Sequence, residues 1–150
     1  MSMTPRSDWS LIEEIIARAR VCRLGFSDAG RPYIVPLSFG YHERTLYFHS
    51  AETGRKVRLA QAGGEVCFEI DIDLGVVEAP QPCQWGIDYL SVIGWGEVRM
   101  VKDEQEKVRA LGIIMSQYSE GEHSFPPAAV AKTCVFAVEI SEATAKTASP

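Results

Sequence analysis

The residues best suited to chemistry gather in one short segment, Leu46–Lys56, which passes from apolar residues into a turn and ends in two cations. A glycine stands directly before Arg55 and Lys56. A phosphate monoester needs close hydroxyl and backbone N–H donors, together with fixed positive charge that offsets the dianion. The segment is therefore typical of a phosphate site. Taken alone, it is equally well explained as a solvated turn whose two cations open a surface helix.

The composition limits the class of protein. A length of 150 residues with 46% hydrophobic content predicts a single domain over 1–150 with its own core. A net charge of −5 argues against nucleic-acid binding through a basic face, and it makes the local cations of 55–58 stand out. The four cysteines are scattered without a CxxC pair, which argues against a disulfide framework and against a metal site.

The distribution of apolar residues argues against a membrane protein. Every apolar run is interrupted by charge, glycine or proline before it reaches the length of a membrane-spanning helix. Residues 1–6 lack the apolar stretch of a signal peptide. We therefore expect a cytoplasmic location and no membrane partner.

The periodicity of the apolar residues predicts short strands with a few helices. Ser7-Asp8, followed by apolar residues at helical spacing, predicts a capped helix that ends near Arg20. Pro36 lacks an N–H group, so it predicts an edge or a bulge in its strand. In chain order we expect strands over 21–26, 32–41, 46–49, 65–72, 89–101 and 135–140, with further helices over 54–61 and 103–118.

The remaining segments complete the expected fold. Residues 74–86 and 119–132 have no clear period and are expected to be irregular, and the polar residues 141–150 are expected to form a mobile tail. Gly94 and Gly96 inside the long strand indicate bending or close backbone approach, as barrel closure requires. Hairpin-linked strands with peripheral helices predict a mainly β fold, a small antiparallel barrel.

The order and spacing of these motifs resemble the pyridoxamine 5′-phosphate oxidase-related flavoproteins, and within them the nitroimidazole-reductase-like branch. The segments that carry the resemblance are Val21–Phe26, Pro32–Phe39, Tyr47–Ser50, Gly54–Lys56, Ser91–Val98 and Glu142–Lys146. The resemblance implies an FMN-binding split β-barrel. It also implies a homodimer with the flavin at the subunit interface.

The resemblance further implies which residues contact the cofactor. The backbone of the strand around Pro36 would line the isoalloxazine ring, and the residues at the end of the 46–49 strand would lie near the ribityl chain and phosphate. Arg55 and Lys56 match the basic pair that holds the phosphate, and Tyr89 or Ser91 would reach the cofactor from the other subunit. The implied cofactor-binding residues are Val35, Pro36, Leu37, Ser38, Phe39, His49, Ser50, Arg55, Lys56, Tyr89 and Ser91.

His49 is the one candidate for a catalytic group. Its imidazole could hydrogen-bond the flavin or a substrate, or act as a general acid, and cofactor contact is the favoured role. The alternative is a strand-end histidine bonded to a backbone carbonyl. The chain has no G-x-S-x-G motif and no carboxylate pair at fixed spacing, so any catalysis is expected to rely on the cofactor.

The expected function is that of an FMN-dependent oxidoreductase that passes electrons from NAD(P)H to a small organic acceptor. No Rossmann signature is present, so a nicotinamide would bind only transiently over the flavin. Oxidases that make pyridoxal phosphate carry a basic C-terminal segment, which this chain lacks, so that substrate is not expected. The alternatives are a flavin carrier or sensor without turnover, or the same barrel holding haem or a deazaflavin.

Overall fold

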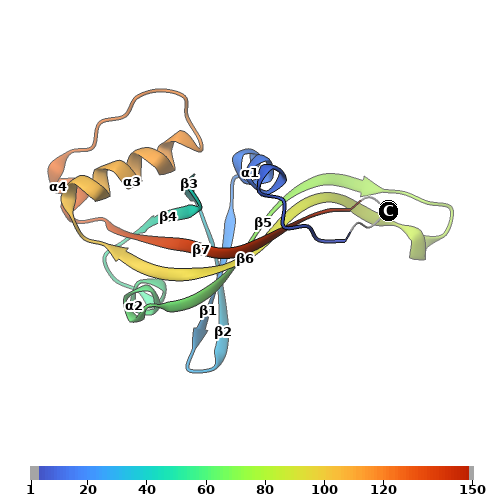
Figure 1. The fold of residues 1–150 in the computed structure, drawn as a ribbon, viewed down its shortest axis with the longest axis horizontal. Helices are drawn as coiled ribbons and strands as arrows, with labels where there is room; N and C mark the ends of the chain where they lie inside the picture. Colours follow the sequence, from blue (N-terminus) through green and yellow to red (C-terminus); the bar gives the residue numbers. More distant parts are fainter. Residues whose placement is uncertain (1–3, 149–150) are drawn as a thin grey trace.

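A seven-stranded antiparallel sheet with strand order β2-β1-β5-β6-β7-β4-β3 organises the computed structural model, which describes residues 4–148 (Figure 1). The β1–β2 hairpin runs across the direction of β6 and β7, and the helices lie around the sheet (Figure 1). The strands are β1 Cys22–Asp28, β2 Arg31–Leu37, β3 Gly40–His42, β4 Thr45–Ser50, β5 Gly64–Val77, β6 Gly86–Val101 and β7 Cys134–Ala148. The helices are α1 Trp9–Arg18, α2 Arg55–Ala62, the short 3-10 turn Pro82–Gln84, α3 Glu104–Ser116 and α4 Pro127–Ala131.

The strand predicted over 32–41 is divided in the structure. β2 ends at Leu37, and the chain crosses through Ser38 and Phe39 to begin β3 at the opposite edge of the sheet. The prediction of one continuous strand is therefore wrong. The expected edge position of Pro36 is confirmed, because β2 has a partner on one side and Pro36 lies opposite Arg23 of β1.

The ends of three strands extend beyond their predicted limits. β5 and β6 continue as a long hairpin, in which residues 75–77 pair with residues 86–88 after a bulge between Asp73 and Gly75, so the loop predicted over 74–86 is shorter in the structure. This hairpin forms the arm that projects from the body in Figure 1. β7 was expected to end at Ile140 and be followed by a mobile tail, but it continues along β6 to Ala148. Residues 149–150 lie outside the described part of the chain.

Small side chains explain why the tail prediction failed over 141–148. Ala143, Ala145 and Ala148 are buried, with exposed fractions of 5%, 1% and 8%, while polar residues alternate with the first two of them. Alanine contributes little to a mean hydropathy, yet it fills an inward position where strands approach closely. The segment predicted as irregular over 119–132 also contains the five-residue helix α4.

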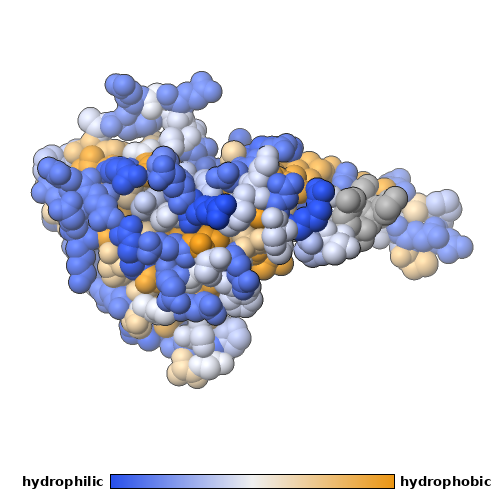
Figure 2. Space-filling model, viewed as in Figure 1, coloured by the Kyte–Doolittle hydropathy of each residue, from blue (hydrophilic) through white to orange (hydrophobic). Residues whose placement is uncertain are grey.

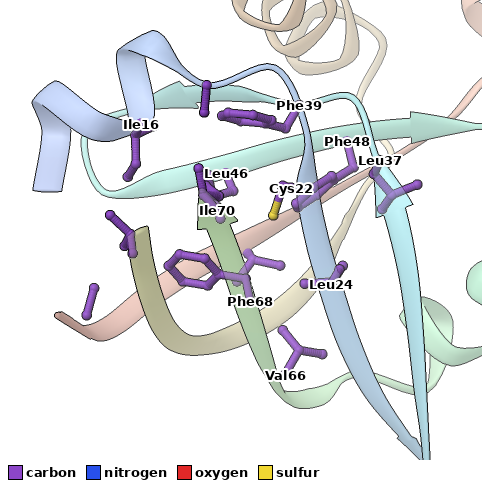
Figure 3. Packing of buried hydrophobic residues seen from close by; sticks show 14 of the residues in the cluster. Ile16, Cys22, Leu24, Leu37, Phe39, Leu46, Phe48, Val66, Phe68 and Ile70 are labelled. Atoms are coloured by element: carbon purple, nitrogen blue, oxygen red, sulfur yellow. The ribbon is translucent and has the colours of Figure 1, made fainter. Parts of the chain in front are cut away.

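The core lies inside the curved sheet. Phe39, Phe48, Phe68 and Phe136 are fully buried, and the rings of Phe48 and Phe136 stack with centroids 5.3 Å apart. Figure 3 shows Cys22, Leu24 and Phe68 converging on this interior from neighbouring strands. A smaller cluster, which includes Tyr47, Ala110 and Ile114, fills the space between α3 and the outer face of the sheet.

The two glycines of β6 lie where close approach was expected. A Cβ atom on Gly94 would collide with the ring of Phe68, and one on Gly96 would collide with the carbonyl oxygen of Glu139. The register between β6 and β7 also shifts between Trp95 and Gly96. Among residues 4–148, no helix is both long and apolar enough to span a membrane.

Candidate functional site

The N-terminus of α2 differs from those of the other long helices in lacking a side-chain cap. Asp8 caps α1 and accepts from the N–H of Ser10 at 3.1 Å, and Asp103 caps α3 and accepts from the N–H of Glu106 at 3.0 Å. α2 begins instead after Gly54, which has no side chain and a φ of 133°. The first-turn N–H groups of α2 are therefore free to meet an external anion.

A cluster of charged side chains, Arg55–Asp28–Arg58, lies beside this helix end. Arg55 Nε and Arg58 Nη2 both donate to Asp28 Oδ2, at 3.1 and 3.0 Å. The hydrogen bond from Arg58, followed by the one from Arg55, lowers the pKa of Asp28 below its usual range. Two guanidinium groups on one carboxylate leave an excess positive charge. The charge of Lys56 adds to this excess, because within the described residues no carboxylate lies within 4.0 Å of its ammonium group.

The β1–β2 hairpin holds Arg55 in place. The Arg55 guanidinium lies over the ring of Tyr33 of β2, with 4.0 Å between its central carbon and the ring centroid. Its Nε is bound to Asp28, so the two terminal nitrogens can still donate to a ligand. Asp28 and Tyr33 were not predicted as site residues. In the sequence, Asp28 looks like part of an ordinary hairpin turn, and the residues around it do not indicate its contact with Arg55, 27 positions away.

His49 and Ser50 end β4, on opposite faces of that strand. Ser50 lies opposite Cys134 of β7 and donates its hydroxyl to the carbonyl oxygen of Ala51 at 2.9 Å. His49 points to the outer face, where α3 and α4 lie, and borders a pocket there. Within residues 4–148 no backbone carbonyl and no side chain accepts a hydrogen bond from its imidazole.

Burial, and then the charge of Lys56, lower the pKa of His49. The imidazole is therefore neutral at neutral pH, with one ring nitrogen that donates and one that accepts. The charge of Lys56 acts on His49, whereas the guanidinium of Arg55 turns toward Asp28 and Tyr33. The role of His49, Ser50, Arg55 and Lys56 in binding a cofactor stays a prediction.

The predicted ring-lining segment runs from the last residues of β2 into the crossing that follows it. Leu37 and Phe39 are core residues, so only their backbone can face a ligand, whereas Pro36 and Ser38 are exposed. Val35 is half-buried on the same strand. The N–H of Phe39 is not free, because it donates to the hydroxyl of Tyr118 at 3.0 Å.

Tyr118 was not predicted as a site residue. Its hydroxyl accepts from Phe39 and donates to the carbonyl oxygen of Arg20 at 2.6 Å. It therefore ties the crossing between β2 and β3 to the chain that follows α1. The neighbouring Gln117 donates to the carbonyl oxygens of Ile16 and Ala19, at 2.9 and 2.8 Å, without touching the crossing.

Tyr89 and Ser91 do not join this site within one chain. They lie on the outer face of β6, opposite Asp73 and Asp71 of β5. β5 and β1 lie between β6 and β2, which puts Ser91 about 14 Å from β2 at the usual spacing between strands. That a second subunit brings these residues to the cofactor stays a prediction.

Comparison with known proteins places this geometry in context. The family model described as pyridoxamine 5′-phosphate oxidase matches residues 8–147. A candidate 5-nitroimidazole antibiotic resistance protein from Bacteroides thetaiotaomicron VPI-5482 is 33% identical in sequence. The match covers 98% of this chain and 90% of that one, with a TM-score of 0.83. Comparison with curated proteins finds no match.

Two more distant structures share the fold. An FAD-binding protein from Mesorhizobium loti is 23% identical over 97% of this chain and 98% of its own, with a TM-score of 0.70. An FAD and heme binding protein from Mycobacterium smegmatis is 16% identical over 99% of this chain and 75% of its own, with a TM-score of 0.89. The expected antiparallel split β-barrel is thereby confirmed.

Proposed function

Because the chain belongs to the pyridoxamine 5′-phosphate oxidase family, we propose that it is an FMN-dependent oxidoreductase that passes electrons from NAD(P)H to a small organic acceptor. The observation that carries this proposal is the excess of cations at the uncapped start of α2. The similarity to the Bacteroides protein supports an acceptor of the nitro-aromatic kind. The flavin, when bound, supplies the hydride and electron transfer.

The donors at the site fit the phosphate end of FMN. A phosphate monoester is close to a dianion at neutral pH and accepts through three oxygens. Arg55 can donate its two terminal nitrogens, and Lys56 adds a compact charge that has no carboxylate partner among the described residues. The first-turn N–H groups of α2 add further donors, and the Ser50 hydroxyl can join them by turning away from the carbonyl oxygen of Ala51, to which it donates in this structure.

The rest of the proposed cofactor site serves orientation. The exposed backbone at Ser38 and the half-buried Val35 border the space beyond β2, where the isoalloxazine ring would lie. Phe39 is held by Tyr118 and by the core, so this wall is rigid and can exclude water from one side of the ring. FMN is favoured over FAD because the donors match one terminal phosphate.

We also propose that the protein is a homodimer. Ile34, Gly25, Cys67 and Trp95 follow one another across four neighbouring strands on the outer face of the sheet. Ile34 is 67% exposed and Trp95 42%, and Ile93 beside them is 48% exposed. Exposed hydrophobic residues also appear on the projecting β5–β6 arm (Figure 2). An apolar patch of this kind suits a subunit interface, and a second copy could bring its Tyr89 and Ser91 to the flavin.

The proposed location is the cytoplasm. The cysteines Cys22, Cys67, Cys83 and Cys134 are free, which suits a reducing compartment. The acidic net charge of −5 gives no support for a nucleic-acid partner.

An absorbance spectrum of the purified protein tests the proposal. We expect flavin bands, or stoichiometric uptake of added FMN by protein that is purified colourless. Protein that takes up no FMN would contradict the cofactor assignment. Anaerobic mixing with NADH and NADPH then distinguishes an enzyme from a carrier, because an enzyme bleaches the flavin with at least one of them.

A further inference from the structure

A separate pocket of about 220 Å³ opens next to His49, on the outer side of the sheet. Leu111, Ile114 and Met115 of α3 form one wall, and Phe125 and Val130 contribute to the other. His49 closes the end that faces β4. None of the residues in these two walls belongs to the proposed phosphate site or to the proposed subunit interface.

The size of the pocket limits what it can hold. An apolar protein cavity of about 150 Å³ accepts benzene. A pocket of 220 Å³ is therefore large enough for one substituted ring, and small compared with the sites of about 300 Å³ or more that hold drug-sized ligands. The three fused rings of a flavin are too large for it.

The walls offer one polar position. None of the lining residues carries a charged side chain, and only His49 and Thr133 are polar among them. Thr133 already donates its hydroxyl to the carbonyl oxygen of Ala129 at 2.7 Å. His49 is therefore the lining group with a free donor and a free acceptor, and its pKa is lowered by burial and by Lys56, so it is neutral.

The charges behind the walls disfavour cations. Lys107 donates to the carbonyl oxygen of Val130 at 3.1 Å, directly behind the pocket wall, and Lys56 acts on His49 from the other side. Positive charge behind apolar walls repels a cationic ligand, and apolar walls desolvate any ion. A neutral ring with a polar substituent fits best.

We propose that this pocket binds a small uncharged aromatic molecule, with its ring between α3 and α4 and its polar substituent hydrogen-bonded to His49. His49 immediately precedes Ser50 in β4 but points to the opposite face, so the pocket lies across this strand from the Ser50 hydroxyl.

Benzamide is a suitable probe, because it is neutral and has a single ring. We expect it to bind flavin-free protein and to shift the NMR signals of the His49 imidazole. Benzylammonium has a similar size but is cationic, and we expect it to bind at least tenfold more weakly. Equal binding of the two, or benzamide binding that leaves the His49 signals unmoved, would overturn the proposal.

A pair of variants in one helix tests the location. Ala129 lines the pocket and is exposed, so Ala129→Phe should fill the space without disturbing the core and weaken benzamide binding at least tenfold. Ala128→Phe is the control, because Ala128 is exposed in the same helix and does not line the pocket. Equal affinities in the two variants would place the ligand elsewhere.

His49→Leu tests the polar contact without changing the volume greatly. We expect it to weaken benzamide binding while leaving the binding of toluene, which has no polar substituent, within twofold of the wild type. Loss of affinity for both would contradict the hydrogen bond to His49.

Failure to take up FMN would contradict the proposed function alone, since the binding tests use flavin-free protein.

Discussion

Two three-membered ion clusters on this barrel are opposite in charge. At the start of α2, Arg55 and Arg58 share Asp28 at 3.1 and 3.0 Å. On the outer face of the sheet, Arg23 instead bridges two carboxylates, Glu69 at 3.3 Å and Asp71 at 2.9 Å. The first cluster has one cation too many, and the second has one carboxylate too many.

The difference shows how each kind of imbalance is relieved. Burial, together with Asp71, raises the pKa of Glu69 to about 7, so the acidic cluster can relieve its repulsion by holding a proton. A guanidinium group cannot lose its proton in a protein, so the basic cluster at α2 has no such route. Its excess charge is compensated by solvent or by a bound anion. For this reason we propose the basic cluster, and not the acidic cluster, as the ligand site.

The largest expected effect comes from removing the cations at α2. Arg55→Ala combined with Lys56→Ala should weaken FMN binding at least 100-fold, because a hydrogen bond to a charged group contributes about 1.5–3 kcal/mol. Quenching of flavin fluorescence measures the affinity. Arg109→Ala removes an exposed cation from α3 and serves as the control. Affinity within threefold of the wild type in the double variant would contradict the phosphate assignment.

A helix end that the chain caps with its own carboxylate should behave differently. Asp103→Ala removes the acceptor for the N–H of Glu106 and should cost about 1 kcal/mol in the free energy of unfolding. Urea denaturation measures that loss. FMN affinity should not change, and a parallel loss of affinity would mean that the two helix ends are not independent.

Tyr118→Phe should have a smaller effect on the cofactor. It removes the hydroxyl that holds the N–H of Phe39, and a net hydrogen bond of about 1 kcal/mol corresponds to roughly fivefold weaker FMN binding. Gln117→Leu is the matched control, because it breaks the same junction with α1 but does not touch the crossing. If both variants weaken FMN binding equally, the effect is one of general stability.

The acidic cluster should appear in the pH dependence of stability. The pKa of Glu69 is raised from 4.5 to about 7 by folding, so the folded protein binds more protons than the unfolded chain between these values. Its contribution to stability is present at low pH and is lost as the pH rises toward 7. Glu69→Gln should flatten the dependence of the free energy of unfolding on pH. The change should be about 1 kcal/mol or less, because a third of the Glu69 side-chain surface stays in water. An unchanged slope would contradict the shared proton.

Local chemistry made much of the fold predictable. The Asp8 cap, the turn before Arg31 and the glycines flanking α2 act over a few residues, and their elements lie where they were expected. The end of β7 was not predictable from hydropathy, because alanines carry its inward face. The crossing at Ser38 was also missed, since it depends on which edge of the sheet the next strand joins.

The candidate site was predictable where one segment contains it. His49, Ser50, Arg55 and Lys56 lie within eight positions of one another, so their spacing and types were visible in the sequence. Asp28 contacts Arg55, which is 27 positions away, and Tyr118 contacts Phe39, which is 79 positions away. Only folding of the chain brings these residues together. The pocket beside His49 depends on α4, a helix of five residues, which is too short to show a periodicity of apolar residues in the sequence.

We propose that the start of α2 binds the phosphate of a flavin. Riboflavin has the same ring and ribityl chain as FMN but no phosphate, so a parallel titration of the two isolates that contact. We expect FMN to bind at least 100-fold more tightly than riboflavin to the wild type, and this preference to disappear in the Arg55→Ala, Lys56→Ala protein. Equal affinities for FMN and riboflavin in the wild type would contradict the account.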